Sequence, residues 1–309
     1  MSTFKVTKGR DGRHNEVLTA DDLSQELYDV LLSNDLIACE KILVSPFLDI
    51  MDITGFSHSQ IQLIQSAASK KLCPKIYSVV SVEQTSPEYS FGSRKLDNTF
   101  QGILKGKKVL EIWGASGAGK SQLALQMCSA LPPSQYSAYI STEGNISTTR
   151  LFDMCSARGV KNANCHIQSC SSVDSFSDCI MRQLPLLLAV KPVKLVIIDS
   201  IAAPFRAGEV DGGGIRRAQK IRSIGQQLKY LASHFNVLVV VLNQATDNPV
   251  TGKQPALGLT WSYLVNSRMR LQKLEFECEV GTRRLSVDKA SCIKAGTFVD
   301  CKIQNEGLL

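Results

Sequence analysis

The sequence lacks the residue pairs that a zinc site or a disulfide framework needs. None of its 10 cysteines forms a Cys-x-x-Cys pair, and of the four histidines only His166 lies beside a cysteine. Such sites require ligands in closely spaced pairs. We therefore expect reduced thiols that are mostly buried.

Long apolar runs are also missing. The longest, Val237–Leu242, has six residues, whereas a helix needs about 20 to cross a bilayer. The first 13 residues carry charges where a signal peptide needs an apolar stretch. We expect an intracellular protein with no membrane partner.

Aromatic residues are sparse, at 6% of 309, but with 44% hydrophobic and 20% charged residues the composition is that of a globular protein. It excludes collagen-like, mucin-like and wholly disordered chains, and the length allows about two domains. Residues 1–75 carry a net charge of −2 and residues 76–309 one of +9. The basic C-terminal part suits a polyanion such as nucleic acid or a nucleotide.

We expect residues 1–16 to form a disordered tail and residues 17–75 to form a small helical domain. From Leu23 to Leu72 apolar residues recur every three to four positions, which is the spacing of an amphipathic helix. One apolar face contains Leu27, Leu31 and Leu32, and another contains Ile61, Ile64 and Ala68.

A glycine turn divides this helical region. Gly55 can adopt a positive φ there, and Ser57 or Ser59 can cap the helix that follows. Two short helices about a glycine resemble a helix-hairpin-helix module, which holds a DNA backbone through main-chain amides. A small packing bundle explains the same pattern equally well.

Residues 76–95 follow Pro74, are rich in Ser and contain Pro87 and Gly92, which predicts an extended linker. Beyond the linker, strands and helices alternate. The predicted strands are Val109–Trp113, Ala138–Ser141, Leu195–Ile198, Val237–Leu242 and Arg268–Gln272. Strands that are apolar throughout are typical of a parallel sheet covered on both faces. We expect residues 96–309 to form an α/β domain with a mostly parallel central sheet.

The most specific motif follows the first of these strands. The run Gly114-Ala115-Ser116-Gly117-Ala118-Gly119-Lys120-Ser121 fits G-x-x-x-x-G-K-[ST] in full and precedes an amphipathic stretch. Its glycines allow backbone amides to cradle phosphate oxygens at a helix N-terminus. Lys120 can reach the β- and γ-phosphates, and the Ser121 hydroxyl can ligate Mg²⁺. The motif predicts a P-loop that binds a nucleotide with Mg²⁺.

Three further strands also end in polar residues. Asp199 ends the run Leu195–Ile198, where a carboxylate can hold the magnesium shell through water. Glu143 follows Ala138–Ser141 and can orient the water that attacks the γ-phosphate, although a glutamate that begins a helix would look the same. Gln244 follows Val237–Leu242 and can sense the γ-phosphate. We expect all three side chains to meet Lys120 around one triphosphate.

These motifs resemble, in their order along the chain, those of the RecA/RadA recombinase family, and within it the eukaryotic recombinase paralogues. Three further stretches carry the resemblance: Ser-Gln-Leu-Ala-Leu-Gln after the P-loop, Ile198-Asp-Ser-Ile-Ala-Ala-Pro-Phe-Arg206, and Pro255-Ala-Leu-Gly-Leu-Thr-Trp261. The resemblance implies a RecA-like P-loop ATPase core with ATP and Mg²⁺ as cofactors. It also implies that Lys120, Glu143 and Gln244 are catalytic and that Ser121 and Asp199 hold the metal.

The resemblance further implies a nuclear accessory protein of homologous recombination. Such paralogues bind single-stranded or branched DNA, partner another recombinase paralogue, and assist the filament of the main strand-exchange recombinase. The segments after Asp199 and Gln244 correspond to the family's DNA-binding loops. Basic residues in or beside them are the DNA-binding candidates: Arg206, Arg216, Arg217 and Lys253. The first segment also contains Glu209 and Asp211, so a solvated loop without a DNA contact is an alternative.

Two departures from the family favour a small heteromeric complex over an unlimited filament. Ser141 stands where strand-exchanging recombinases often carry Asp, and Tyr77-Ser-Val-Val80 matches their Phe-x-x-Ala polymerisation plug only in part. We expect a slow DNA-dependent ATPase, with a nucleotide-stabilised scaffold of negligible turnover as the alternative. A P-loop small-molecule kinase is disfavoured, because such kinases lack a glutamate at the adjacent strand end and usually carry an arginine-rich lid.

Overall fold

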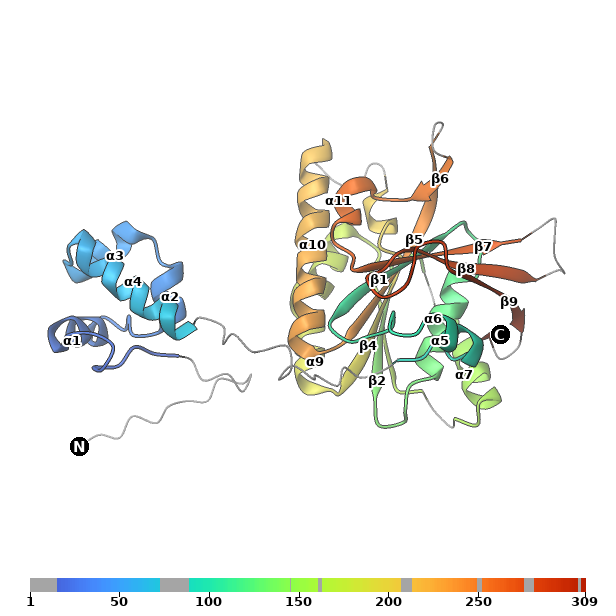
Figure 1. Ribbon diagram of the computed structural model, residues 1–309, viewed down its shortest axis with the longest axis horizontal. Coiled ribbons are helices and arrows are strands. Elements are labelled where there is room, and N and C mark those ends of the chain that lie inside the picture. Colours follow the sequence, from blue (N-terminus) through green and yellow to red (C-terminus); the bar gives the residue numbers. More distant parts are fainter. Residues whose placement is uncertain are drawn as a thin grey trace. The chain divides into compact units, whose positions relative to one another are not determined.

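The computed structural model describes residues 16–72, 89–144, 146–160, 163–206, 213–248, 252–274, 281–304 and 307–309. The chain divides into two compact units, Met1–Gln84 and Thr85–Leu309 (Figure 1). Each unit has its own buried apolar cluster or clusters. In the part of the chain so described, no helix combines the length and the apolarity needed to cross a membrane.

The first unit is helical, as expected. Its described helices are α1 (Gln25–Ser33), α2 (Cys39–Val44), α3 (Phe47–Thr54) and α4 (His58–Leu72). The predicted apolar face of α4 is confirmed, because Ile61, Ile64 and Ala68 have no exposed surface. The predicted face of α1 is wrong at one position: Leu27 and Leu31 are buried, but Leu32 is 47% exposed because it lies about 100° round the helix from Leu31.

The glycine turn between α3 and α4 forms as predicted. Gly55 ends α3 with φ of +70°, and its amide donates to Met51 O. Ser57 is the residue that caps α4: its Oγ accepts from the Gln60 amide at 3.4 Å, and its own amide donates to Gln60 Oε1 at 2.8 Å. This reciprocal pairing satisfies two amides at the helix start.

The second unit contains a sheet of ten strands among its described residues. In chain order they are β1 (Lys108–Gly114), β2 (Tyr136–Ser141), β3 (Cys165–Ser169), β4 (Val193–Asp199), β5 (Leu238–Asn248), β6 (Gly252–Pro255), β7 (Ser267–Lys273), β8 (Thr282–Lys289), β9 (Phe298–Gln304) and β10 (Gly307–Leu308). The order across the sheet is β10-β9-β8-β7-β1-β5-β4-β2-β3, with β6 paired to β5. The pairings β7–β1, β1–β5, β5–β4, β4–β2 and β2–β3 are parallel, so the predicted mostly parallel α/β fold is confirmed. The remaining pairings, of β8 with β7 and of β6 with β5 among them, are antiparallel.

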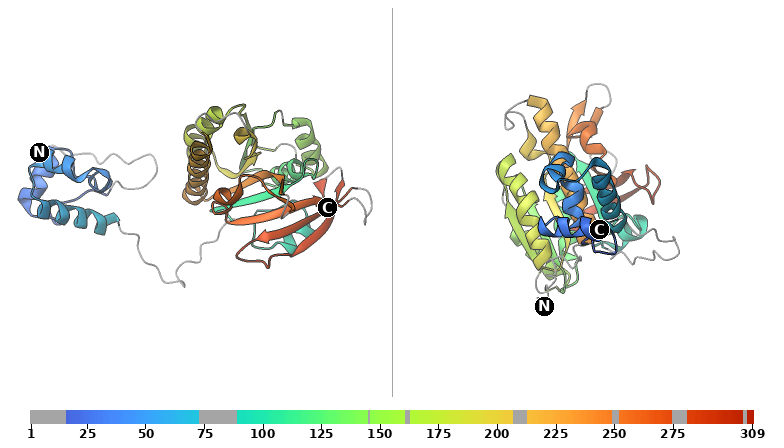
Figure 2. Two further views of the ribbon diagram at one scale, coloured as in Figure 1. Left: turned by 90° about the horizontal axis from the view of Figure 1, so that it is seen from above. Right: turned by 90° about the vertical axis from the view of Figure 1, so that its left-hand side faces the viewer.

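Helices cover both faces of this parallel core (Figures 1 and 2). One face packs on α6 (Lys120–Ser129) and α7 (Thr148–Ala157), the other on α8 (Val173–Asp178), α9 (Leu184–Val190) and α10 (Gly213–Phe235). In β5, Leu238 and Val240 face the first cluster while Val239 and Val241 face the second. A strand buried on both faces has no polar side, which explains its uninterrupted apolar run.

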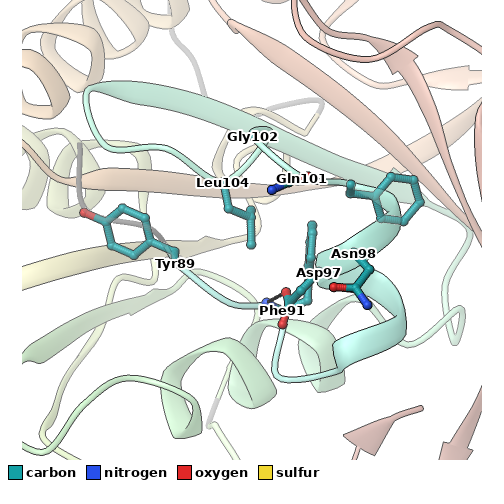
Figure 3. Close-up of a pocket in the computed structure, with 8 residues that line it drawn as sticks. Tyr89, Phe91, Asp97, Asn98, Gln101, Gly102 and Leu104 are labelled. Carbon is teal, nitrogen blue, oxygen red and sulfur yellow. Dashed lines mark hydrogen bonds between the residues drawn. The ribbon is translucent and has the colours of Figure 1, made fainter. Parts of the chain in front are cut away.

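The core begins earlier than the sequence predicts. Residues 89–93, assigned to the linker, are buried or partly buried: Phe91 has no exposed surface, and its amide donates to Asp97 Oδ1 at 2.7 Å. The helix α5 (Arg94–Thr99) follows at once. A cavity of about 330 Å³ lies beside it, lined by Tyr89, Phe91, Asp97, Asn98, Phe100, Gln101, Gly102 and Leu104 (Figure 3). Residues 1–15 and 73–88, which hold most of the predicted tail and linker and all of Tyr77–Val80, lie outside the described residues.

Candidate nucleotide-binding site

The P-loop joins β1 to α6 and depends on its glycines. Gly117 and Gly119 have φ of +72° and +106°, backbone angles that residues with a side chain rarely adopt. A Cβ on Gly114 would lie 2.1 Å from the backbone oxygen of Leu271 in β7. The start of the loop therefore lies against the neighbouring strand only because Gly114 lacks a side chain.

Lys120 is folded back over the loop. Its Nζ donates to Gly114 O at 2.8 Å and to Ala115 O at 2.9 Å. Burial lowers the pKa of Lys120, and the charges of Asp199 and Glu143 act against that shift. The ammonium group thus lies within electrostatic reach of both carboxylates.

Asp199 ends β4 beside a buried tyrosine. Tyr139 of β2 is 1% exposed and donates its hydroxyl to Asp199 Oδ2 at 2.6 Å. Thr142 braces the same strand end, because its amide donates to Asp199 O at 2.7 Å and its hydroxyl to Ser200 O at 2.6 Å. Asp199 is therefore held from the β2 side by backbone and side chain.

Glu143 follows β2 and collects three donors on one oxygen. Its Oε1 accepts from Ser200 Oγ at 3.0 Å, from Arg206 Nη2 at 2.5 Å and from Gln244 Nε2. The side chain of Glu143 remains 35% exposed. The structure thus places the predicted water-orienting glutamate and the predicted γ-phosphate sensor in direct contact.

The four predicted residues come together because their strands are neighbours. The order β1-β5-β4-β2 brings four carboxyl ends to one edge, where open α/β sheets bind ligands. Gly114 is paired with Gln244 across β1 and β5, and Asp199 with Ser141 across β4 and β2. The Ser121 hydroxyl and the Asp199 carboxylate are hard oxygen donors, which fit Mg²⁺.

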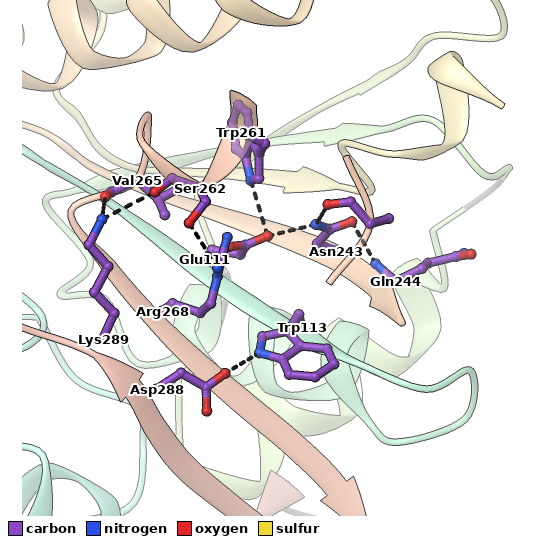
Figure 4. Close-up of polar contacts among 11 residues, drawn as sticks. Glu111, Trp113, Asn243, Gln244, Trp261, Ser262, Val265, Arg268, Asp288 and Lys289 are labelled. Carbon is purple, nitrogen blue, oxygen red and sulfur yellow. Dashed lines mark hydrogen bonds and ion pairs between the residues drawn. The ribbon is translucent and has the colours of Figure 1, made fainter. Parts of the chain in front are cut away.

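A buried polar network lies behind this edge (Figure 4). Glu111, in the middle of β1, has no exposed surface; it accepts from Asn243 Nδ2 at 2.6 Å and from Trp261 Nε1 at 3.1 Å, and it forms an ion pair with Arg268. Burial raises the pKa of Glu111, and Arg268 opposes that rise most strongly. Asn243 Oδ1 in turn accepts the amide of Gln244 at 2.8 Å. The network therefore fixes the backbone that carries Gln244.

Sequence reasoning missed this network, although one signal was present. Glu111 interrupts the apolar strand Val109–Trp113, and a charge in a fully buried strand needs a partner. The contact between Tyr139 and Asp199 had no such signal in the sequence, because a tyrosine is common in an apolar strand.

The described residues at the start of the first predicted DNA-binding segment contact the site. Arg206 pairs with Glu143, and Arg217, near the start of α10, donates its Nε to Phe205 O at 2.9 Å. Arg216 is exposed and, among the described residues, has no hydrogen bond or ion pair. Residues 207–212, with Glu209 and Asp211, lie outside the described part. Of the three arginines at the described ends of this segment, Arg216 is thus the one with no partner among the described residues.

The second predicted segment is a β-hairpin, not a loop. The strand β5 continues past Gln244 to Asn248, and β6 returns antiparallel to it. Backbone pairing explains the difference, because residues 245–248 supply ladder partners that an apolar-run criterion does not detect. Lys253 stands directly opposite Asp247 in this ladder, and both are exposed.

Comparison with known proteins assigns the fold and motifs to one family. The Rad51 family model matches residues 84–259, which is more than half of the chain. The chain belongs to the Rad51 family. The matched residues include the P-loop, Glu143, Asp199, Gln244 and the four DNA-binding candidates, and they end before β7.

Individual members of the Rad51 family are similar over most of their length. DNA repair protein XRCC3 of Mus musculus is 28% identical, with 82% of this chain and 84% of that protein covered. DNA repair protein RAD51 homolog 2 of Homo sapiens is 27% identical, with 93% and 87% covered. Among solved structures, the RadB recombinase is 26% identical with a TM-score of 0.60, covering 71% of this chain and 98% of that one.

Proposed function

We propose that this protein binds ATP with Mg²⁺ and hydrolyses it slowly in response to DNA, as a nuclear accessory protein of homologous recombination. The observation that carries the proposal is the meeting of Lys120, Glu143, Asp199 and Gln244 at one edge of the sheet. Family membership and relatives named for DNA repair support the same role.

The chain's own residues would share the work as follows. The P-loop amides bind the phosphates, and Lys120 leaves the Gly114 and Ala115 carbonyls to neutralise their charge. Glu143 orients the attacking water, and Gln244 beside it detects the γ-phosphate. Bound Mg²⁺, held by Ser121 and through water by Asp199, would supply further charge neutralisation.

Arg206 offers a route by which DNA acts on hydrolysis. Its side chain is 57% exposed, so a DNA phosphate can reach it. An exposed ion pair is worth at most about 1 kcal/mol, so a phosphate can replace the Glu143 carboxylate. We propose that DNA withdraws Arg206 and leaves Glu143 free to orient water, while Arg216, Arg217 and Lys253 add to the DNA-binding surface.

The edge strand β3 supports the proposal that this protein binds a protein partner. Among the described strands it pairs only with β2, so its other edge is open. A cavity of about 270 Å³ adjoins it, lined by Ala138, Ile140, His166, Ile167, Gln168, Cys179, Gln183, Leu184 and Leu187. An open edge beside an apolar cavity suits strand addition by an extended segment. We propose that another recombinase paralogue, or the main recombinase, contributes that segment.

Two variants test the nucleotide site. Lys120→Ala removes the phosphate-binding ammonium and is expected to abolish ATP binding in a titration with a fluorescent ATP analogue. Glu143→Gln keeps the shape of the side chain and is expected to retain ATP binding but lose about 100-fold or more in hydrolysis, the usual share of a positioned base. Unchanged hydrolysis in Glu143→Gln would refute the assignment of Glu143.

One observation favours a second candidate, a nucleotide-stabilised scaffold. The three donors on Glu143 Oε1 hold this carboxylate away from base chemistry. Single-turnover hydrolysis separates the two, with the partner present and single-stranded DNA added or omitted. Stimulation by DNA supports the ATPase, whereas DNA-independent, negligible turnover supports the scaffold.

A further inference from the structure

Tyr139, to which the sequence alone assigns no functional role, contacts Asp199 on the side of the site proposed to hold Mg²⁺. Tyr139 lies in β2, which pairs with β4 so that Ser141 stands opposite Asp199. Its ring is enclosed, with 1% of the residue exposed, and its hydroxyl donates to Asp199 Oδ2 at 2.6 Å. This hydrogen bond occupies Oδ2 of Asp199, so the other carboxylate oxygen, Oδ1, can face the magnesium shell.

The Tyr139 hydroxyl faces both residues that fit Mg²⁺. It donates to Asp199 Oδ2 and lies beside the side chain of Ser121. A phenol hydroxyl that meets a carboxylate acts as the donor of the hydrogen bond. Tyr139 can therefore orient the Asp199 carboxylate on the side where Ser121 lies.

We infer that Tyr139 is a positioning residue for magnesium, holding the Asp199 carboxylate in the orientation that the metal shell requires. The inference rests on the proposed nucleotide site and adds a residue to it. Carboxylates that serve metals are themselves hydrogen-bonded, and loss of such a partner typically weakens metal affinity about 10- to 100-fold. Packing alone does not require the hydroxyl, because a phenylalanine ring fills the same space.

The test is Tyr139→Phe in the full chain, which removes only the hydroxyl. Tyr136→Phe is the matched control: it lies in the same strand three residues earlier, and its ring stacks on His166 with centroids 5.4 Å apart. Binding of a non-hydrolysable fluorescent ATP analogue is titrated first in EDTA and then over a range of Mg²⁺ concentrations.

For Tyr139→Phe we expect unchanged nucleotide affinity in EDTA and a Mg²⁺ midpoint that rises about 10- to 100-fold. For Tyr136→Phe we expect the wild-type Mg²⁺ midpoint. A Tyr139→Phe protein that folds normally and shares the wild-type midpoint overturns the inference, because a purely structural hydroxyl would change thermal unfolding without changing metal dependence.

Two further results separate a failure of the inference from a folding defect and from a failure of the proposed nucleotide site. If Tyr139→Phe does not fold, Tyr139→Met also removes the hydroxyl and adapts to an irregular space, and the same Mg²⁺ midpoint decides. If the wild-type protein shows no Mg²⁺-dependent binding of the analogue while remaining folded, the proposed nucleotide site itself fails, and the inference about Tyr139 falls with it.

Discussion

A single oxygen, Oε1 of Glu143, receives hydrogen bonds from Ser200, Arg206 and Gln244. Ser200 and Arg206 lie in the connection between β4 and α10, and Gln244 lies in β5. One carboxylate therefore connects the predicted γ-phosphate sensor with the first predicted DNA-binding segment. Both Glu143 and Arg206 are partly exposed, so solvent screens their pair and keeps it easy to break.

At this residue scale, Arg206→Ala is expected to raise DNA-free ATP hydrolysis by up to about five-fold, because the exposed pair is worth at most about 1 kcal/mol. It should also reduce the stimulation by single-stranded DNA. Arg216→Ala is the control, since Arg216 does not contact Glu143 and should lower only DNA affinity. Steady-state hydrolysis with and without DNA measures both variants, and unchanged DNA-free hydrolysis in Arg206→Ala would contradict the prediction.

At the scale of elements, one buried charge pair ties several strands together. Glu111 of β1 contacts Arg268 of β7 and Asn243 of β5, and it also accepts from Trp261 in α11 (Gly258–Ser262). Asn243 Nδ2 donates to Ala256 O at 2.9 Å, and the Ala256 amide donates to Gln244 O at 2.9 Å. The base of the β5–β6 hairpin is therefore closed by the same network that fixes Gln244.

Glu111→Gln is expected to lower the free energy of unfolding by about 3–5 kcal/mol, because it leaves the Arg268 charge buried without its partner. Arg268→Gln should cost a similar amount, and the double variant less than the sum of the two. Urea unfolding followed by tryptophan fluorescence measures all three. A cost below about 1 kcal/mol for Glu111→Gln, or strict additivity, would show that the pair does not hold these strands.

At the scale of the whole molecule, the first unit is closed on itself. Lys71, at the end of α4, donates to Val17 O at 2.8 Å and forms an ion pair with Asp22. The hydrogen bond from Lys71 is the largest cause that lowers the pKa of Asp22 to about 2, and bonds from Thr19 add to it. The two ends of the helical unit are thereby joined, 49 residues apart in sequence.

The depressed pKa sets the direction of the pH dependence. Asp22 contributes stability above its ordinary pKa of 3.8, and this contribution is lost as pH falls from about 4 to about 2. Asp22→Asn is therefore expected to destabilise the first unit at pH 7 by about 1 kcal/mol or less, with no difference from wild type near pH 2.

Hydrogen exchange of residues 16–72, corrected for intrinsic rates, measures this difference. Tryptophan fluorescence reports the second unit separately, because Trp113 and Trp261 are the two tryptophans of the chain. Asp35→Asn is the control: its pair with Lys41 is 3.0 Å long, but Asp35 is 95% exposed. An Asp22→Asn protein that is as stable as wild type at pH 7 would contradict the role given to this pair.

Local pattern was a reliable guide wherever a side chain's task depends on its immediate neighbours in sequence. The P-loop, the five predicted strands and the turn at Gly55 all form, although β5 continues to Asn248, beyond its predicted end at Leu242. The antiparallel strands β8 and β9 were not predicted, because charged residues such as Arg283, Arg284 and Asp300 interrupt them. Arg283 is nevertheless buried, and its Nε donates to Ala118 O of the P-loop at 2.9 Å.

What the sequence determined by itself is the chemistry available: a glycine-rich phosphate loop, carboxylates and amides at the ends of apolar strands, and a basic C-terminal part. What the tertiary structure alone decided is which of these groups touch. Arg206 meets Glu143, Tyr139 meets Asp199 and Glu111 meets Arg268 across separations of 63, 60 and 157 residues. Contacts at such separations follow from strand order and register, which depend on the packing of the whole sheet and are not encoded in any short segment.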